Sequence, residues 1–80
     1  MGEVADRIRE YLQSDLRLHR RVALADDTPL LDGLVDSLQV MRIIAFVEER
    51  FAIRLDVAEV TEENFGTIAA IERLVEGKRA

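Results

Sequence analysis

The chain of 80 residues contains no cysteine, one histidine, one proline and few aromatic residues. The absence of cysteine excludes disulfides, thiolate metal ligands and thiol redox chemistry, and the lone His19 excludes a multi-histidine zinc site. Because 49% of the residues are hydrophobic, the composition is typical of a globular protein rather than a disordered one. The scarcity of aromatic residues leaves leucine, isoleucine, valine and alanine to fill the core, which favours helices packed on helices.

Long hydrophobic runs are also missing, and none approaches the roughly 20 residues that a membrane-spanning helix needs. The first ten residues, MGEVADRIRE, carry charges where a signal peptide needs its apolar segment. Asp6 stands where a myristoylation signal has serine or threonine. We therefore expect a soluble, cytoplasmic and monomeric protein without a membrane partner, formed by one domain over residues 1–80.

Acidic residues outnumber basic ones, and the net charge of −5 is unevenly distributed. Residues 26–63 contain ten acidic and three basic residues, whereas each flank has a net charge of +1. An acidic centre repels nucleic-acid phosphates and suits a basic partner, so the sequence predicts no nucleic-acid partner. The one basic cluster, RLHRR at 17–21, is interpreted as the solvated end of a helix, where cations lie near the negative pole of the dipole.

Hydrophobic periodicity predicts four helices and no strand. Apolar residues recur at helical spacing over 3–16, and a long loop over 18–36 follows, with apolar residues that can contact the core. A second helix is expected over 37–51, a short helix within 61–66 and a last helix over 68–75. The predicted fold class is therefore all-α: a small four-helix bundle with three main helices, one short helix and a long connection between the first two.

Single residues mark where several of these helices begin and end. Thr61 and Thr67 are suited to cap the third and fourth helices, and Gly77 is suited to end the last one. Between the second and third helices the helical pattern breaks, and we expect Ile53 and Leu55 to anchor an irregular segment.

Two adjacent residues, Asp36 and Ser37, both have side chains that favour the N-cap position of the helix over 37–51. With Ser37 as the cap, the third helical residue would be Val40, which cannot complete a capping box. Asp36 is the better cap because its carboxylate also suits the positive end of the helix dipole. Ser37 then becomes the first helical residue, with an outward hydroxyl at a helix end that favours a phosphate ester.

A nucleophilic role for Ser37 in hydrolysis is the alternative from enzyme chemistry. It requires a base and an oxyanion site, and the only histidine, His19, has no orienting carboxylate suggested by the spacing. The segment DGLVDSL also lacks the Gly-x-Ser-x-Gly turn of hydrolases. The sequence therefore favours a protein that is not an enzyme, with no catalytic and no metal-binding residue.

The segments GLVDSLQVMRIIAFVEERF and VTEENFGTIAAIERLV together resemble the acyl carrier protein family, whose members carry a 4′-phosphopantetheine arm. The resemblance covers about residues 30–75. It implies that Ser37 is the modified serine, and that Asp36 helps a phosphopantetheinyl transferase to hold Mg²⁺ when the serine attacks coenzyme A. The partner contacts that we expect on the second helix are Leu38, Met41, Arg42, Ala45 and Glu48.

Two departures separate the chain from fatty-acid carriers, which usually have glycine three places before the modified serine and a densely acidic second helix. Leu34 occupies that place here and Gly33 precedes it, which is similar to D-alanyl, aminoacyl and peptidyl carriers. Gln39 and Arg42 interrupt the acidic helix, and an arginine repels a basic partner. The resemblance therefore implies a discrete carrier that presents an acyl, aminoacyl or peptidyl thioester in a dedicated pathway of secondary metabolism or the cell envelope.

The resemblance also implies the partners: a phosphopantetheinyl transferase, an adenylating acyl or aminoacyl ligase, and downstream acyl-processing enzymes. A fatty-acid or polyketide acyl carrier is the alternative within the family. From another class, an unmodified helical interaction module would use Asp36 and Ser37 only as caps. A helix-turn-helix DNA binder is opposed by the acidic centre and by the 19-residue gap over 18–36.

Three apolar or aromatic residues lie at the margin of the predicted core. Met41 and Phe46 lie off the core stripe of their helix, and partial burial against the short helix or the loop is one interpretation. The other is a contact surface or the lining of an acyl cavity, for which the flexible thioether of Met41 is suited. Tyr11 is expected at the edge of the core.

Overall fold

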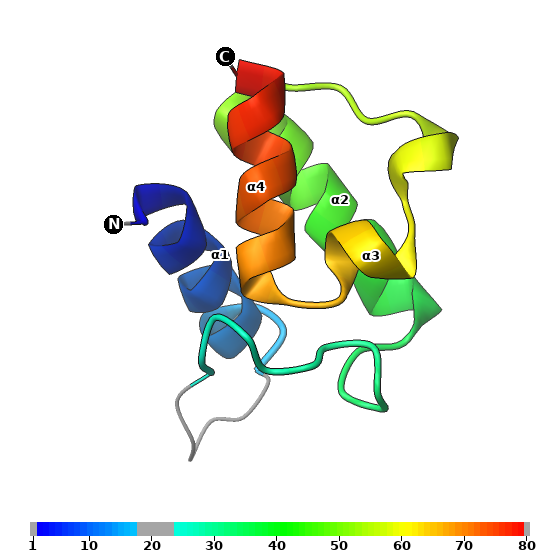
Figure 1. The fold of residues 1–80 in the computed structure, drawn as a ribbon. Helices are drawn as coiled ribbons and strands as arrows, with labels where there is room; N and C mark the ends of the chain where they lie inside the picture. Colours follow the sequence, from blue (N-terminus) through cyan, green and yellow to red (C-terminus); the bar gives the residue numbers. More distant parts are fainter. Residues whose placement is uncertain (1, 18–23, 80) are drawn as a thin grey trace.

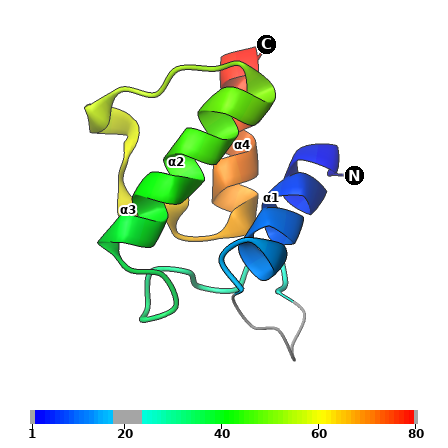
Figure 2. The ribbon, with the colours of Figure 1, turned by 180° about the vertical axis from the view of Figure 1, so that it is seen from behind.

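The computed structural model describes residues 2–17 and 24–79. In chain order its elements are α1 (Glu3–Ser14), α2 (Ser37–Phe51), the 3₁₀ turn η1 (Val57–Glu59), α3 (Glu62–Phe65) and α4 (Ile68–Arg79). The described residues form no strand, so the predicted all-α fold with a short third helix is confirmed. Figures 1 and 2 show α1, α2 and α4 around a common centre, with α3 beside the N-terminal half of α2. None of the helices in these described ranges is long and apolar enough to cross a membrane.

Each long helix turns one apolar stripe toward this centre. In α1 the buried residues are Val4, Ala5, Ile8 and Leu12, and α1 packs mainly against α4. Packing of such stripes removes apolar surface from water, which is the main source of stability in a chain of this size. The other helices contribute the buried residues Ile43, Val47, Phe65, Ile68, Ile71 and Val75.

α1 ends two residues before the predicted boundary. Its last residue is Ser14, and the amide of Leu16 then donates to the carbonyl of Tyr11 with an N–O distance of 3.2 Å. Arg17 follows with a positive φ of 58°, which no helix can continue. Leu16 therefore packs against the core from outside the helix.

The long connection from α1 to α2 is anchored over its described part, residues 24–36, as the sequence predicts. Leu24 and Leu30 are buried. The amide of Leu30 donates to the carbonyl of Gly66 at 2.7 Å, and Nε of Arg9 donates to the carbonyl of Leu24 at 2.8 Å. The remaining features of the loop prediction, His19, Val22 and most of the basic cluster, fall in 18–23 and lie outside the described residues.

The threonine caps that the sequence predicts are confirmed. Oγ1 of Thr61 accepts a hydrogen bond from the amide of Asn64 at 3.1 Å, at the start of α3. Oγ1 of Thr67 accepts one from the amide of Ala70 at 3.0 Å, at the start of α4. Each cap satisfies an amide that has no partner within its own helix.

The prediction that Gly77 ends the last helix is wrong, because α4 continues to Arg79. Beyond the glycine, Nζ of Lys78 lies 2.8 Å from Oε1 of Glu59, and the guanidinium of Arg79 lies 5.6 Å from the ring centre of Phe51. These two tertiary contacts hold the last turn in helical form and outweigh the low helix propensity of glycine.

The segment between α2 and α3 has more structure than the sequence predicts. Ile53 is buried and Leu55 is half-buried, which confirms both as anchors. The turn η1 is an addition: the amide of Asp56 donates to Oε1 of Glu59 at 2.8 Å. The side chain of Asn64 also donates to the carbonyl of Glu59 at 2.9 Å, so that η1 is tied to α3.

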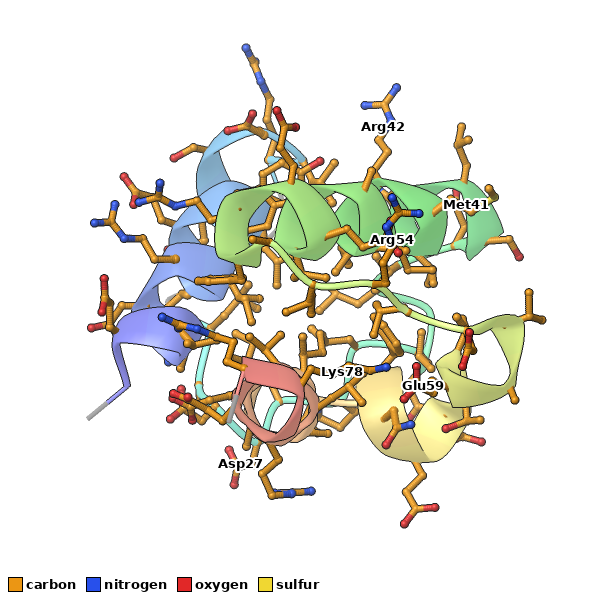
Figure 3. All side chains as sticks on the ribbon, turned by 90° about the horizontal axis from the view of Figure 1, so that it is seen from above. Asp27, Met41, Arg42, Arg54, Glu59 and Lys78 are labelled. Atoms are coloured by element: carbon orange, nitrogen blue, oxygen red, sulfur yellow. The ribbon has the colours of Figure 1, made fainter. Side chains whose placement is uncertain are left out.

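Glu59 is the centre of the contacts between η1 and α4, and its side chain and that of Lys78 point toward one another in Figure 3. The bond from Lys78, followed by the bond from the Asp56 amide, lowers the pKa of the Glu59 carboxyl below its ordinary value of 4.5. Because the folded pKa is the lower one, the pair stabilises the fold above the ordinary value. This contribution is lost as the pH falls through the lowered pKa.

We therefore expect Lys78→Met to be less stable than the wild type in urea unfolding at neutral pH. The difference should shrink once the pH falls below the ordinary pKa of a glutamate, since a protonated Glu59 no longer attracts Lys78. Arg73→Met on the same helix is the matched control, because Arg73 forms no ion pair with any residue of 2–17 or 24–79. A difference for Lys78→Met that stays constant across this pH range contradicts the assignment.

Candidate functional site

The N-terminus of α2 is closed by Asp36, which confirms the predicted cap. Oδ1 of Asp36 accepts a hydrogen bond from the amide of Gln39 at 2.9 Å. In return, Oε1 of Gln39 accepts one from the amide of Asp36 at 3.0 Å. This reciprocal capping box is an addition to the prediction, although the spacing Asp-x-x-Gln in the sequence is its signature. Oδ2 of Asp36 has no hydrogen-bond donor among the described residues.

Ser37 is the first residue of α2, and its side chain is exposed. Its hydroxyl forms no hydrogen bond with any residue that the structure describes, because Asp36 already serves as the cap. The backbone amides of Ser37 and Leu38 also have no acceptor within 2–17 and 24–79, as expected for a first helical turn. The helix end therefore presents an accessible oxygen together with two N–H donors at the positive pole of the dipole, a combination that favours phosphate.

Loss of the capping box should have a measurable cost. Asp36→Ala removes the acceptor for the Gln39 amide, and we expect it to lower the free energy of unfolding by about 1 kcal/mol. Asp36→Asn keeps an acceptor of equal rank and should stay within about 0.5 kcal/mol of the wild type. Urea unfolding followed by circular dichroism measures both. Equal stability of Asp36→Ala and the wild type would show that the capping box does not hold the helix end.

The turn before this helix end explains the glycine that separates the chain from fatty-acid carriers. Gly33 has a φ of 93°, a conformation that favours glycine, and no atom lies within 4 Å of the position of a Cβ. Leu34, which follows it, is half-buried and packs against the core. The turn therefore needs its glycine at 33, while position 34 needs an apolar side chain.

An apolar groove of about 340 Å³ begins beside Ser37 and runs between α2 and α3. Met41 lines this groove and is 66% exposed, so the bundle does not bury it, and the interpretation as a contact surface or cavity wall fits its position. Phe46 does not line this groove. The other apolar residues along the groove are Leu31, Val40, Ile44, Val60 and Phe65.

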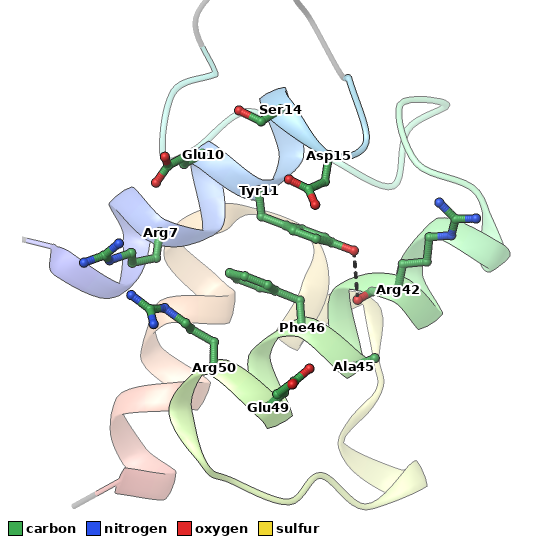
Figure 4. Close-up of a pocket in the computed structure, with 10 residues that line it drawn as sticks. All are labelled: Arg7, Glu10, Tyr11, Ser14, Asp15, Arg42, Ala45, Phe46, Glu49 and Arg50. Carbon is green, nitrogen blue, oxygen red and sulfur yellow. Dashed lines mark hydrogen bonds between the residues drawn. The ribbon is translucent and has the colours of Figure 1, made fainter.

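A second groove, of about 660 Å³, lies between α1 and α2 (Figure 4). Its lining includes the rings of Tyr11 and Phe46, which stack with centres 4.2 Å apart and planes 12° apart. The hydroxyl of Tyr11 donates to the carbonyl of Arg42 at 3.4 Å. The expectation for Tyr11 at the core edge is confirmed, whereas the expected burial of Phe46 against the short helix or the loop is wrong, because it packs on α1.

Two of the residues predicted to contact partners lie next to Ser37. Leu38 is 64% exposed and Met41 is 66% exposed. Both side chains are therefore accessible, and their contact with a partner stays a prediction. Leu38 lies in the first turn of α2, and the half-buried residues of this helix begin with Gln39 and Val40.

The other three predicted contacts lie further along α2. Arg42 and Ala45 are exposed and line the groove between α1 and α2, where Figure 4 shows the Arg42 side chain extending away from the aromatic pair. Oε2 of Glu48 accepts a hydrogen bond from the amide of Leu55 at 2.9 Å. The Glu48 carboxylate thus holds the segment that follows α2, a tertiary role that spacing along the helix does not reveal.

The comparison with protein families identifies the family of the chain. A family model for the phosphopantetheine attachment site matches residues 6–75. The chain therefore belongs to the phosphopantetheine-binding carrier family, which confirms the resemblance to acyl carrier proteins. The cofactor of this family is 4′-phosphopantetheine. The comparison with curated proteins finds no match.

Solved structures share the fold. A chain in a structure described as a crystal structure of FAD-dependent dehydrogenase superposes with a TM-score of 0.77 and 25% identity, over 85% of this chain and 97% of that chain. A solution structure of a non-covalent extended docking domain complex of the Pax NRPS, PaxA T1-CDD/PaxB NDD, gives a TM-score of 0.76 and 14% identity. That match covers 99% of this chain and 71% of the other. The bundle described above is therefore the fold of a carrier domain.

Proposed function

We propose that Ser37 carries the 4′-phosphopantetheine of this family and that the chain acts as a carrier rather than as an enzyme. The observation that supports this most is the Ser37 hydroxyl, which is exposed and forms no hydrogen bond within the described residues. The amides of Ser37 and Leu38 lie at the same helix end and suit a phosphodiester on this oxygen. The residues present therefore fit the attached group.

The chemistry of attachment follows from these atoms. Oγ of Ser37 forms a bond to the phosphorus of coenzyme A that bears the pantetheine, the adenosine bisphosphate half leaves, and the hydroxyl proton passes to a base of the transferase. Asp36 assists this step because its Oδ2 can coordinate the Mg²⁺ that the transferase holds. The capping box occupies only Oδ1. The attached arm supplies the thiol that the cysteine-free chain lacks, for an acyl group held as a thioester.

Asp36→Asn separates the two roles of this residue. Asparagine caps a helix about as well as aspartate, but it lacks the negative charge that a divalent cation prefers. We expect near-normal stability together with modification by the transferase that is slower by about tenfold or more. The initial rate of adduct formation, measured by intact mass at several Mg²⁺ concentrations, tests this. A normal rate in the variant would leave Asp36 with the capping role alone.

We infer further that the cargo is an amino acid or another small acid of a dedicated pathway, tethered by one domain over residues 1–80 that works as a cytoplasmic monomer. Support comes from Gly33, Leu34 and Arg42, where the chain departs from fatty-acid carriers, and from the likeness to a structure of the Pax NRPS. A fatty-acid or polyketide carrier is the alternative within the family.

The partners that this proposal requires are a phosphopantetheinyl transferase, an adenylating acyl or aminoacyl ligase and enzymes that process the tethered group. The description of the other similar structure names an FAD-dependent dehydrogenase, which makes a flavoenzyme one class of processing enzyme to test. Loading of the modified protein by purified adenylating enzymes, each with ATP and one candidate acid, identifies the cargo from the mass of the thioester. Loading only by long-chain fatty acyl ligases favours the alternative.

The carrier function itself is tested with coenzyme A, Mg²⁺ and a broad-specificity transferase. The expected result is a single phosphopantetheine adduct in the intact mass. The proposal is rejected if no adduct forms under conditions that modify a control carrier completely. An unmodified helical interaction module would then be the remaining function.

A further inference from the structure

Gln39 forms two hydrogen bonds with the same residue, Asp36, and only one of them depends on the glutamine side chain. The backbone amide of Gln39 donates to Oδ1 of Asp36 at 2.9 Å, a bond that any residue except proline can form. Oε1 of Gln39 accepts from the amide of Asp36 at 3.0 Å, which requires a side chain with an acceptor at this reach. A substitution of Gln39 can therefore remove the second bond and leave the first.

The two bonds hold Asp36 at both of its ends. One fixes the carboxylate, and the other fixes the peptide group that precedes the residue, so that Asp36 keeps an extended backbone with φ of −98° and ψ of −177°. Oδ1 is bonded within the box, and Oδ2 has no donor among the described residues. Because a carboxylate is planar, holding the backbone and Oδ1 also fixes the direction of Oδ2.

Two amides beside Asp36 compete for Oδ2 when this residue is not held. The amides of Ser37 and Leu38 have no acceptor within 2–17 and 24–79. An aspartate at an N-cap position can accept from the second helical amide as well as from the third, so a looser Asp36 can engage Leu38 with its other oxygen. An oxygen that already accepts from an N–H group is a weaker ligand for a cation. The Gln39 side chain therefore keeps one oxygen of Asp36 available.

We propose that Gln39 is a positioning residue for phosphopantetheine attachment, whose side chain holds Asp36 so that Oδ2 stays free for the Mg²⁺ of the transferase. The inference rests on the carrier function proposed above, and it gives Gln39 no contact with coenzyme A or with the metal. Removal of a group that orients a metal ligand by a hydrogen bond typically costs about 10–100-fold in metal affinity or activity. The use of Mg²⁺ should therefore weaken, while the attachment oxygen of Ser37 is unaffected.

Two substitutions of Gln39 separate the side-chain bond from the rest of the box. Gln39→Met removes Oε1 at similar side-chain size, and Gln39→Glu keeps an acceptor that completes a capping box. Initial rates of adduct formation by a broad-specificity transferase, at saturating coenzyme A and varied Mg²⁺, give kcat and the KM for Mg²⁺. We expect Gln39→Met to raise this KM about tenfold, with kcat at saturating Mg²⁺ within about twofold of the wild type. Gln39→Glu should restore the KM to within about threefold.

Hydrogen exchange in the unmodified protein, without transferase or metal, reports the same contact. The amide of Asp36 donates to Oε1 of Gln39 in the wild type, so this bond slows its exchange with water. Nuclear magnetic resonance should show this amide exchanging several-fold faster in Gln39→Met and near the wild-type rate in Gln39→Glu. An unchanged exchange rate in Gln39→Met would mean that the side chain does not hold Asp36, and the proposal would be overturned.

Gln13→Met is the matched control, because Gln13 is the only other glutamine in the sequence and lies in α1. It should alter neither the KM for Mg²⁺ nor the exchange of the Asp36 amide. The positioning role is also overturned if Gln39→Met keeps the wild-type KM for Mg²⁺, or if Gln39→Glu does not restore it. Failure of the wild type to gain any adduct would instead reject the carrier function.

Discussion

Ser37→Ala is expected to lose the phosphopantetheine adduct completely, because alanine lacks the oxygen that becomes part of the phosphodiester. The free energy of unfolding should change by less than about 0.5 kcal/mol, since the Ser37 side chain is exposed and Asp36 is the cap. Intact mass after incubation with coenzyme A, Mg²⁺ and transferase gives the first result, and urea unfolding gives the second. Together they separate a lost attachment site from a lost fold.

Ser14 is the only other serine in the sequence and provides the matched control. It is exposed at the end of α1, where the helix dipole is negative and does not favour phosphate. Ser14→Ala should gain the adduct at the wild-type rate. If Ser37→Ala still gained an adduct, the attachment would have to lie on another residue, and the account of the α2 N-terminus as the site would be wrong.

Among the substitutions proposed for this protein, Phe65→Ala is expected to lower the free energy of unfolding most, by about 3–5 kcal/mol. The Phe65 side chain is 2% exposed, and it belongs to the four-residue α3, which has little stability of its own. Its removal leaves a cavity beside α4 and widens the groove next to Ser37. Domains of this kind are stable by only about 5–15 kcal/mol, so a large share of the protein's stability depends on one ring.

The measurement is urea unfolding, in which the midpoint should fall while the slope stays that of the wild type. Val57→Ala is the control, because Val57 lies in the neighbouring turn η1 and is 90% exposed. Its effect should stay within about 0.5 kcal/mol. A loss below about 1 kcal/mol for Phe65→Ala would mean that α3 does not close the core as described.

Much of the fold could be predicted because the signals for it are local. The apolar stripe of α1 and the bounds of α2 follow from helical periodicity, which depends only on residues within a few turns. The caps at Asp36, Thr61 and Thr67 are equally local, since each side chain bonds an amide three residues on. The candidate site could be located for the same reason: Ser37 follows directly from the choice of Asp36 as the cap.

The features that could not be predicted depend on contacts between distant parts of the chain. The sequence predicts a helix end at Gly77 because glycine has a low helix propensity. The helix continues because Lys78 forms an ion pair with Glu59, which is 19 residues away in the sequence. Glu48 lies where a solvent-exposed acid is expected, but the Leu55 amide binds its carboxylate. The ten acidic residues counted over 26–63 therefore do not describe α2, which itself contains two acidic and two basic residues.

The central claim, that Ser37 is the attachment site, is tested most directly by locating the adduct. Trypsin should release residues 22–42 of the modified protein as one peptide, in which Ser37 is the only serine and Thr28 the only threonine. Tandem mass spectrometry of this peptide is predicted to place the whole phosphopantetheine mass on Ser37. An adduct on Thr28, on a peptide that contains Ser14, or on no peptide at all would contradict the account.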